Sequence, residues 1–460
     1  MITSPAFAGK RYAVLGLART GIAVVEALLA SGAQVTAWDA REEPRVALAA
    51  RHDGSALELA DPLAIDLGGF DAVVVSPGVP LNTHPIAEAA AAVGVPVIGD
   101  IELFAQARAD LPAHRVVAIT GTNGKSTTTA LVHHLLQSAA MPARMGGNIG
   151  LPIMAQKPLP AGGVYVLELS SYQIDLLRSL ESDVAVLLNI TPDHLDRYAD
   201  FAAYVASKAR LFAMQRRDQH AVFGTGDAET LGIAATEEVR RLPGHVFRAH
   251  GANLAALQGD WPSLQGPHNL QNAAAAVAVV EALGLVPGQW QPALKAFRGL
   301  PHRMERVVES NGVLFINDSK ATNPASTAPA LAAFPPRAGA EGSEKRVHWI
   351  LGGLPKGDNL RECEPFFGNV AAAYVIGDAG PLFAELLAPH MQVHRSEMMA
   401  EAIRQAIEAA GPGDVVLLSP ACASFDQFRD YEARGDAFRQ IVEALTGVHP
   451  APGARMGSAS

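Results

Sequence analysis

The seven residues G-T-N-G-K-S-T at positions 121–127 constrain the fold more than any other part of the chain. An apolar, strand-like run at 116–120 precedes them, and a helix-like run at 128–136 follows. A strand, a glycine-rich turn, a lysine with a hydroxyl residue and then a helix is the order of a phosphate-binding loop. The backbone amides of such a turn point into one concavity, and the helix N-terminus adds partial positive charge. We therefore predict a sheet that carries a phosphate site.

The loop is a shortened variant of the common pattern, because Ile119 stands where that pattern has its first glycine and the nearer Gly121 replaces it. Lys125 is predicted to lie near the terminal phosphates, and the Ser126 hydroxyl is a candidate Mg²⁺ ligand. The alternative is a plain turn that opens a helix and exposes its lysine. The predicted phosphate-binding residues are Gly121, Thr122, Asn123, Gly124, Lys125, Ser126 and Thr127.

Length and charge limit the classes of protein to which the chain can belong. Its 460 residues indicate about three domains. A net charge of −10 argues against a general nucleic-acid binder, which would show a basic footprint. The apolar runs are too short to span a bilayer, so we predict no membrane insertion. Two cysteines, Cys363 and Cys422, cannot build a disulfide framework and fit a reducing compartment.

The first 103 residues have the pattern of a Rossmann-type βαβ unit. Strand-like runs at 12–15 and 34–38 flank the turn G-L-A-R-T-G (16–21) and a helix at 22–30, and Asp39 ends the second strand. Because the second glycine of the fingerprint is replaced by Ala18, a dinucleotide, another nucleotide and plain βαβ packing all stay open. A third strand, at 71–75, runs into a turn with Gly78, at the strand end where open α/β sheets bind ligands.

The remainder of the chain repeats the alternation of strands and helices. We expect strands at 164–167 and 184–188 in the second domain, and at 313–316, 347–351, 373–376 and 415–418 in the third. Residues 335–344 read as a surface loop. The predicted fold is α/β in three domains: a Rossmann-like domain (1–103), a central P-loop ATPase-type domain with a mostly parallel sheet (104–298), a Rossmann-like C-terminal domain (299–448) and a disordered tail (449–460).

Several polar residues follow predicted strands, where a ligand would lie. Glu168 directly follows a strand, and a carboxylate there can hold Mg²⁺. His194, Asn148 and Lys208 lie in loops or on a following helix of the same domain. Each also has a plain alternative, namely a helix cap, a loop histidine, a turn residue and a solvated lysine. In the third domain the residues with suitable chemistry are Arg303, the string N-D-S-K-A-T-N (317–323), Lys356 and Ser424.

Taken together these strings resemble the Mur ligases, the ATP-dependent amino-acid ligases of peptidoglycan synthesis, over nearly the whole chain. N-D-S-K-A-T-N together with S-P-A-C-A-S-F-D-Q-F (419–428) resembles the D-glutamate-adding branch in particular, and the string D-N-P-R of another branch is absent. The other strings that carry the resemblance are G-T-N-G-K-S-T, G-G-N-I-G (146–150), E-L-S-S-Y-Q (168–173), D-H-L-D-R-Y (193–198), H-N-L-Q-N (268–272) and L-P-H-R (300–303).

The resemblance implies a cytoplasmic, monomeric ligase that joins D-glutamate to UDP-N-acetylmuramoyl-L-alanine through an acyl phosphate, with ATP and two Mg²⁺ ions. It implies a catalytic and metal set of Lys125, Ser126, Glu168, His194 and Lys208, with Lys208 carbamylated. It implies nucleotide contacts from Asn272, Arg303 and Asp318 in addition to the loop. The implied UDP-substrate residues are Arg19, Thr20, Asp39 and Gly78, Asn148 is a further substrate residue, and the implied D-glutamate residues are Lys320, Thr322, Lys356, Ser424 and Phe425.

Other functions compete with this one. Another Mur-type ligase or a folylpolyglutamate-type ligase would share the central domain, although the latter class lacks an N-terminal UDP-binding domain. A nicotinamide-dependent oxidoreductase could be built on the turn at Gly16 and would bind NAD(P) but not ATP. A nucleotide-gated binding protein would bind ATP without turnover that depends on an amino acid.

Overall fold

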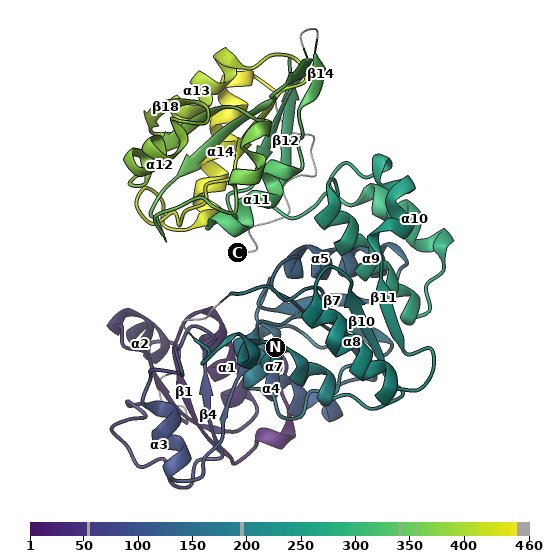
Figure 1. The fold of residues 1–460 in the computed structure, drawn as a ribbon. Helices are drawn as coiled ribbons and strands as arrows, with labels where there is room; N and C mark the ends of the chain where they lie inside the picture. The colour runs from purple at the N-terminus through teal and green to yellow at the C-terminus, as the bar shows by residue number, and fades with distance from the viewer. Residues whose placement is uncertain (53–55, 194–196, 340–341, 356, 449–460) are drawn as a thin grey trace. The chain divides into compact units, whose positions relative to one another are not determined.

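Each of the three predicted α/β segments forms a sheet of its own (Figure 1). The computed structural model describes residues 1–52, 56–193, 197–339, 342–355 and 357–448, so His194, Lys356 and the tail at 449–460 lie outside the described residues. The chain divides into two compact units, which are described separately below. The first comprises residues 1–255 with 271–295, and the second comprises 256–270 with the chain from 296 onward.

The N-terminal sheet has five parallel strands in the order β3-β2-β1-β4-β5, which is the doubly wound Rossmann order without its sixth strand. The predicted strands and helix are confirmed, and two short strands at the sheet edges, β3 and β5, were not predicted. The elements are η1 (Pro5–Phe7), β1 (Arg11–Leu15), α1 (Arg19–Ala30), β2 (Gln34–Trp38), α2 (Glu42–Ala49), β3 (Leu57–Leu59), β4 (Ala72–Val75), α3 (Ile86–Ala92), β5 (Val97–Ile98) and α4 (Asp100–Ala107).

The second sheet has six parallel strands in the order β11-β10-β9-β6-β8-β7. Strand β6 lies between β8 and β9, where the strand order reverses, and the loop at 121–127 leaves its carboxyl end. Open α/β sheets bind ligands at this switch point. The elements are η2 (Arg108–Asp110), β6 (His114–Thr120), α5 (Lys125–Ser138), β7 (Ala143–Gly147), η3 (Ile153–Ala155), β8 (Gly163–Glu168), α6 (Ser171–Asp175), β9 (Val184–Leu187), α7 (Phe201–Ala213), β10 (His220–Gly224), α8 (Ala228–Arg240), β11 (Val246–Ala249), η4 (Gly251–Asp260), α9 (Pro267–Ala282) and α10 (Pro287–Ala296).

The third sheet has the order β12-β13-β19-β16-β17-β18, and only the edge strand β12 runs antiparallel to its neighbour. The prediction of a loop at 335–344 is wrong, because β14 and β15 pair there as an antiparallel hairpin in which the Arg337 Nε donates to Glu344. The elements are β12 (Glu305–Ser310), β13 (Val313–Asn317), α11 (Pro324–Ala332), β14 (Arg337–Gly339), β15 (Gly342–Glu344), β16 (Val347–Gly352), η5 (Glu364–Asn369), β17 (Val370–Ile376), α12 (Gly380–Leu387), β18 (Gln392–Glu397), α13 (Met399–Ala409), β19 (Val415–Leu418) and α14 (Tyr431–Thr446).

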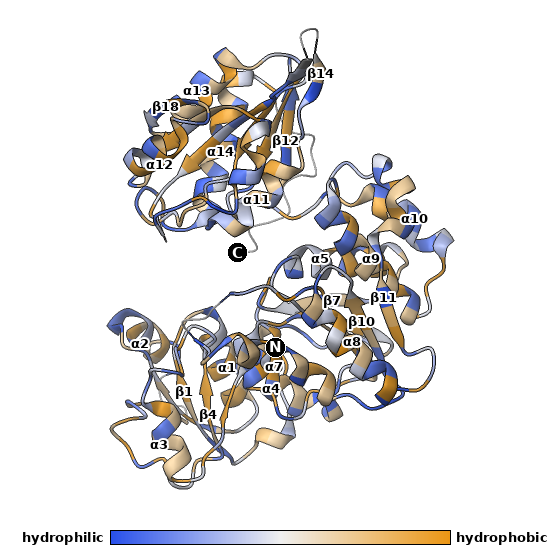
Figure 2. Cartoon of the chain, viewed as in Figure 1, coloured by the Kyte–Doolittle hydropathy of each residue, from blue (hydrophilic) through white to orange (hydrophobic). Residues whose placement is uncertain are grey.

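The central strands of all three sheets are apolar and buried, as in parallel sheets that helices cover on both faces. Every residue of β4, β8, β9, β16 and β19 is buried. Figure 2 shows this as orange strands inside helices that also carry blue, hydrophilic residues. Within the described part of the chain, no helix combines the length and the apolar character that crossing a membrane would require.

A buried glutamate joins the N-terminal sheet to the second one. Glu102 on α4 is 2% exposed. Its carboxylate accepts hydrogen bonds from the backbone amides of Arg178 (2.8 Å) and Ser179 (3.0 Å) and from the Ser179 hydroxyl (2.7 Å). A buried carboxylate that accepts three such bonds fixes the geometry between α4 and the chain after α6.

We expect Glu102→Gln to lower the thermal midpoint of the first unit by about 3–10 °C. Each charge-assisted hydrogen bond contributes roughly 1.5–3 kcal/mol, and the NH₂ group of the glutamine would face N–H and O–H donors in place of a carboxylate oxygen that accepts from them. Differential scanning calorimetry measures this shift. The exposed Glu88 on α3 provides the matched control, Glu88→Gln. A shift no larger than that of the control would contradict the proposed role of Glu102.

Candidate active site

The backbone of the loop at 121–127 requires glycine at two positions. Gly121 has a φ of +152° and Gly124, the residue before α5, has a φ of +85°. A Cβ on Gly124 would overlap the side-chain oxygen of Asn272, and one on Gly121 would lie 3.0 Å from the Cβ of Leu188. Only glycine combines these φ angles with the close approach of its neighbours.

Asn189, at the end of β9, anchors the loop from the neighbouring strand. Its side-chain oxygen accepts from the Asn123 amide at 2.8 Å, its amide nitrogen donates to the Asn123 carbonyl at 3.1 Å, and its backbone carbonyl accepts from the Thr122 amide at 2.9 Å. Sequence analysis did not include Asn189 among the site residues. The signal was present, because a polar residue directly follows a fully apolar strand.

Two lysines converge on one backbone carbonyl beneath the loop. The Nζ atoms of Lys125 and Lys208 each donate to the Gly121 carbonyl at 3.0 Å. Lys125 also donates to the Thr122 carbonyl at 2.8 Å. Lys208 comes from α7, and its Nζ lies 4.7 Å from the centre of the Tyr204 ring one turn earlier. The structure therefore brings together two predicted residues that are 83 positions apart in the sequence.

Lys208 is 1% exposed, so the alternative of a solvated helix lysine is wrong. Burial, followed by repulsion from the Lys125 cation, lowers the pKa of Lys208 to about 7, while Asp193 and Asp175 act in the opposite direction. Near neutral pH a large fraction of this amine is therefore uncharged and carries a free electron pair. An ordinary surface lysine has almost none of that form.

Glu168 ends β8 beside the loop. The Oε1 atom accepts from the Asn148 side chain at 3.1 Å, and Glu168 is 2% exposed. The Oε2 atom is buried and accepts no hydrogen bond from the residues that the structure describes, among which 194–196 are not included. A buried carboxylate oxygen without a donor from these residues is suited to a cation, so the residues fit a Mg²⁺ ion. Within the described ranges, no group of three or more His, Cys, Asp or Glu side chains could hold a metal ion by itself.

In the N-terminal sheet, Asp39 organises the turn after β1. Its carboxylate accepts from the Leu17 amide at 2.7 Å and from the Arg41 Nε at 3.2 Å. Despite partial burial, these bonds hold the pKa of Asp39 below its usual range. The Ser76 hydroxyl donates to the Gly16 carbonyl at 2.8 Å, which ties this turn to the one that contains Gly78. Arg41 was not among the predicted residues.

Arg19 and Thr20 begin α1, directly after this turn. Arg19 is exposed and its guanidinium donates to the Gly150 carbonyl at 3.2 Å. Gly150 follows β7, close in sequence to Asn148, whose amide donates to the Glu168 carbonyl at 2.9 Å. Through Arg19, the predicted substrate residues beside the first sheet thus contact the loop that contains Asn148 in the second.

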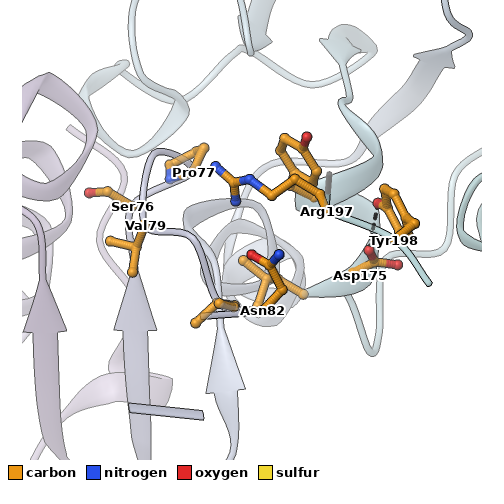
Figure 3. Close-up of a pocket in the computed structure, with 10 residues that line it drawn as sticks. Ser76, Pro77, Val79, Asn82, Asp175, Arg197 and Tyr198 are labelled. Atoms are coloured by element: carbon orange, nitrogen blue, oxygen red, sulfur yellow. Dashed lines mark hydrogen bonds between the residues drawn. The ribbon is translucent and has the colours of Figure 1, made fainter. Parts of the chain in front are cut away.

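A pocket of about 100 Å³ lies beside the turn that contains Gly78 (Figure 3). Ser76 and Pro77 line one side, and the other side is lined by Asp175 and Tyr198, whose hydroxyl donates to Asp175 at 2.8 Å. The Arg197 guanidinium packs over the Tyr172 ring at 4.5 Å, and Figure 3 shows its side chain reaching toward Pro77. Sequence analysis quoted Arg197 and Tyr198 only as part of a string and assigned them no role.

The second compact unit holds Arg303, which precedes β12, and the predicted residues that follow β13 and β19. Asp318 follows β13, accepts from the Met304 amide at 3.1 Å and from the Ser419 hydroxyl at 2.8 Å, and has a pKa that burial raises to about 7. Arg303 is half-buried in the turn before β12. The structure therefore holds Asp318 in a hydrogen-bonded position inside this unit.

The four described residues of the predicted D-glutamate set differ in exposure. The Lys320 Nζ lies 3.8 Å from the centre of the Tyr431 ring, and Thr322 is half-buried before α11. Ser424 is 2% exposed, whereas Phe425 beside it is 69% exposed. All four lie in segments that follow β13 and β19, so the sheet gathers them at one edge.

Comparison with known proteins places this arrangement in one family. Three family models match the chain in order: the MurD-like N-terminal domain of Mur ligases over residues 10–99, the Mur ligase middle domain over 119–280 and the Mur ligase glutamate ligase domain over 302–422. A UDP-N-acetylmuramoylalanine–D-glutamate ligase of Novosphingobium aromaticivorans is 68% identical over 98% of both chains. The chain belongs to the Mur ligase family. A relative of the same name from Sphingopyxis alaskensis is 59% identical over 97% of this Mur ligase and 100% of its own length.

Solved structures share the fold. A UDP-N-acetylmuramate–alanine ligase of Thermotoga maritima aligns with a TM-score of 0.56 at 17% identity, over 95% of this Mur ligase and 99% of its own chain. A UDP-N-acetylmuramoylalanyl-D-glutamyl-2,6-diaminopimelate–D-alanyl-D-alanyl ligase of Acinetobacter baumannii gives 0.57 at 16% identity, over 96% and 92% of the two chains. The predicted α/β fold with three domains and mostly parallel sheets is therefore confirmed.

We expect Gly124→Ala to raise the KM for ATP roughly tenfold or more, because left-handed strain and the overlap with Asn272 cost about 1–3 kcal/mol. Steady-state kinetics with varied ATP measures this change. Gly232→Ala on α8, where an added Cβ meets nothing within 4 Å, is the matched control and should leave the KM unchanged. Equal KM values in the two variants would show that the loop does not hold the nucleotide.

Proposed function

We propose that this Mur ligase adds D-glutamate to UDP-N-acetylmuramoyl-L-alanine with conversion of ATP to ADP and phosphate, as a step of peptidoglycan precursor synthesis. The observation that carries the proposal is the match to D-glutamate ligases at 68% and 59% identity over nearly the full length of the chain. The loop at 121–127 supplies what an ATP-dependent ligase requires first, a cradle of backbone amides with a lysine beside it.

Within this function, Lys125 and the loop amides would hold the phosphates of ATP, and Asn272, Arg303 and Asp318 would make the remaining nucleotide contacts. Ser126 and Glu168 would hold Mg²⁺, and His194 together with a carbamylated Lys208 would support a second ion. The support comes from the Glu168 Oε2, which accepts no hydrogen bond within the described part of the chain, and from the glycine backbone that approaches Asn272. Bound Mg²⁺ would offset the negative charge that accumulates as two anions meet.

The proposed reaction has two steps. A carboxylate oxygen of the alanyl group attacks the γ-phosphorus, the O–P bond of the acyl phosphate forms, and ADP leaves with the electron pair of the broken bridging bond. The uncharged amine of D-glutamate then attacks the acyl carbon, loses a proton and displaces phosphate. Lys125 would follow the γ-phosphoryl group during this transfer. Its Nζ donates to two loop carbonyls, and the more anionic phosphate oxygens would replace these carbonyls as acceptors.

The substrates would be held at the two remaining groups of residues. Arg19, Thr20, Asp39, Gly78 and Asn148 would bind the UDP substrate, supported by the bonds that join the Gly16, Gly78 and Gly150 turns. Lys320, Thr322, Lys356, Ser424 and Phe425 would form the D-glutamate pocket. We propose domain limits at 1–103, 104–298 and 299–448, a monomeric state and a cytoplasmic location, where two buried thiols, Cys363 and Cys422, would stay reduced.

The function predicts phosphate release that depends on both UDP-N-acetylmuramoyl-L-alanine and D-glutamate, and its loss in Lys125→Ala. The reason is that the positive charge beside the loop is removed while the backbone cradle stays. A coupled phosphate assay with each substrate omitted in turn measures this. Lys157→Ala, at an exposed lysine of the same sheet domain, is the control and should keep full activity. Release that ignores D-glutamate but responds to another amino acid would assign the chain to a different branch.

The low pKa of Lys208 predicts how its carbamylation depends on pH. Only the uncharged amine attacks CO₂, forming an N–C bond and releasing a proton, so at constant dissolved CO₂ the carbamate should decrease as pH falls, most steeply below about pH 7. ¹³C NMR of the protein in ¹³C-bicarbonate, with Lys208→Ala as the blank, measures the carbamate signal.

Activity provides the second readout for Lys208. We expect Lys208→Ala to lose most activity and to regain part of it with formate or acetate, which supply the missing carboxylate, but not with a neutral alcohol of the same size. The absence of a ¹³C signal in the wild type, combined with an active Lys208→Ala variant, would show that the lysine is unmodified.

A further inference from the structure

Arg434 is a buried cation that no other part of this account has used. It lies in the first turn of α14, which Asp430 caps through the Ala433 amide at 2.7 Å. The residue is 1% exposed and is one of the largest fully buried side chains among the described residues. An arginine is almost never buried in this way unless its donors are all satisfied.

All five N–H donors of the guanidinium have acceptors, and none of these is a carboxylate. The Nε atom donates to the Ser319 hydroxyl at 3.0 Å. The Nη2 atom donates to the carbonyls of Ser319 (2.9 Å) and Cys422 (3.0 Å), and Nη1 donates to those of Ala423 (3.2 Å) and Gly352 (3.5 Å). Burial lowers the pKa of Arg434 to about 10, so the group stays charged at neutral pH.

The acceptors come from the ends of three neighbouring strands. Ser319 follows β13, Gly352 ends β16, and Cys422 and Ala423 follow β19. These strands are adjacent in the sheet order β13-β19-β16. One side chain therefore fixes three loops whose positions the sheet alone would leave independent, because strand pairing stops where the loops begin.

Each of these loops leads directly into the predicted D-glutamate set. Ser319 precedes Lys320, Ala423 precedes Ser424, and Gly352 begins the segment that leads to position 356. The loops are also bonded to each other, since Leu354 and Ala423 exchange two backbone hydrogen bonds of 3.0 Å.

Gly353 shows how closely the loops meet around the guanidinium. A Cβ at this position would overlap the Ala423 carbonyl and would lie 3.0 Å from the Arg434 Nη1. The cluster therefore has no room for a larger residue at Gly353, and the loops pack around Arg434 at a fixed spacing.

We propose that Arg434 is a positioning residue for the amino-acid substrate: it holds the three strand-end loops at the spacing that a dicarboxylic amino acid requires, without touching that substrate. This inference rests on the proposed function. Sites of this kind depend on groups held within about 0.5 Å by a supporting layer of hydrogen bonds. A fixed cation behind the pocket also favours a substrate with two negative charges.

Loss of the guanidinium should therefore weaken capture of D-glutamate and spare the earlier phosphoryl transfer. We expect Arg434→Lys, which keeps the charge but has three donors instead of five, to raise the KM for D-glutamate roughly 10- to 100-fold, since hydrogen bonds of a charged group are among the strongest that hold such loops. The KM values for ATP and UDP-N-acetylmuramoyl-L-alanine should change by less than about threefold.

Hydroxylamine separates the two steps, because it attacks an acyl phosphate in place of D-glutamate and does not use the amino-acid pocket. ADP formation in the presence of hydroxylamine should stay near the wild-type rate in Arg434→Lys. Arg439→Lys is the matched control. Arg439 lies on the same helix, but it donates to Glu305 of the edge strand β12 at 2.7 Å and not to the three loops. It should leave the KM for D-glutamate unchanged.

Three outcomes decide the matter. The positioning role would be overturned if the KM for D-glutamate of Arg434→Lys stayed within about threefold of wild type. It would also be overturned if ADP formation with hydroxylamine fell as much as turnover with D-glutamate. Either result would leave the proposed function intact. If Arg434→Lys does not fold, Ser319→Ala removes one acceptor of the guanidinium and should raise the same KM about 3- to 10-fold; no change there would overturn the inference. Wild-type turnover that ignores D-glutamate would overturn the proposed function, and this inference with it.

Discussion

The carbonyl of Gly121 is the point on which the arrangement of the first unit depends. It accepts hydrogen bonds from both Lys125 and Lys208, so two cations are drawn together beneath the loop although they repel each other. The left-handed backbone at Gly121 and Gly124 turns this carbonyl toward the lysines, and the anchoring by Asn189 keeps it there. The depressed pKa of Lys208 follows from this geometry, because its burial and the neighbouring cation both disfavour the charged form.

Sequence patterns predict those features that are determined locally. The glycines at 121 and 124, the lysine and the following helix form a local strand–loop–helix pattern that the sequence alone indicates, and the apolar runs locate the central strands. Features that depend on contacts with other segments were harder to predict from the sequence. The edge strands β3 and β5 have only three and two residues, and the hairpin at 337–344 is rich in glycine, so they form because adjacent segments offer partners.

The same distinction applies to the site residues. Taken alone, Lys208 reads as a solvated helix lysine, and only its position on α7 behind the loop buries it. Arg434 gave no signal, because four of its five hydrogen bonds go to backbone carbonyls, which every residue possesses and no motif encodes. Asp39 illustrates the intermediate case. Its place after β2 was evident, but its bond to the Leu17 amide shows that it also supports the turn itself.

Lys208 and Arg434 are both buried cations, but they differ in the chemistry that burial leaves them. Both are 1% exposed. Burial and the Lys125 cation lower the pKa of Lys208 to about 7, whereas burial lowers the pKa of Arg434, a guanidinium that is more basic than an amine to begin with, to about 10. An amine that loses its proton near neutral pH can form a covalent bond to an electrophile such as CO₂. A guanidinium that keeps its proton cannot, and it acts as a permanent charge with fixed geometry. The chain therefore places the lysine with the lowered pKa beneath the loop at 121–127, and the permanently charged arginine behind the loops of the C-terminal sheet.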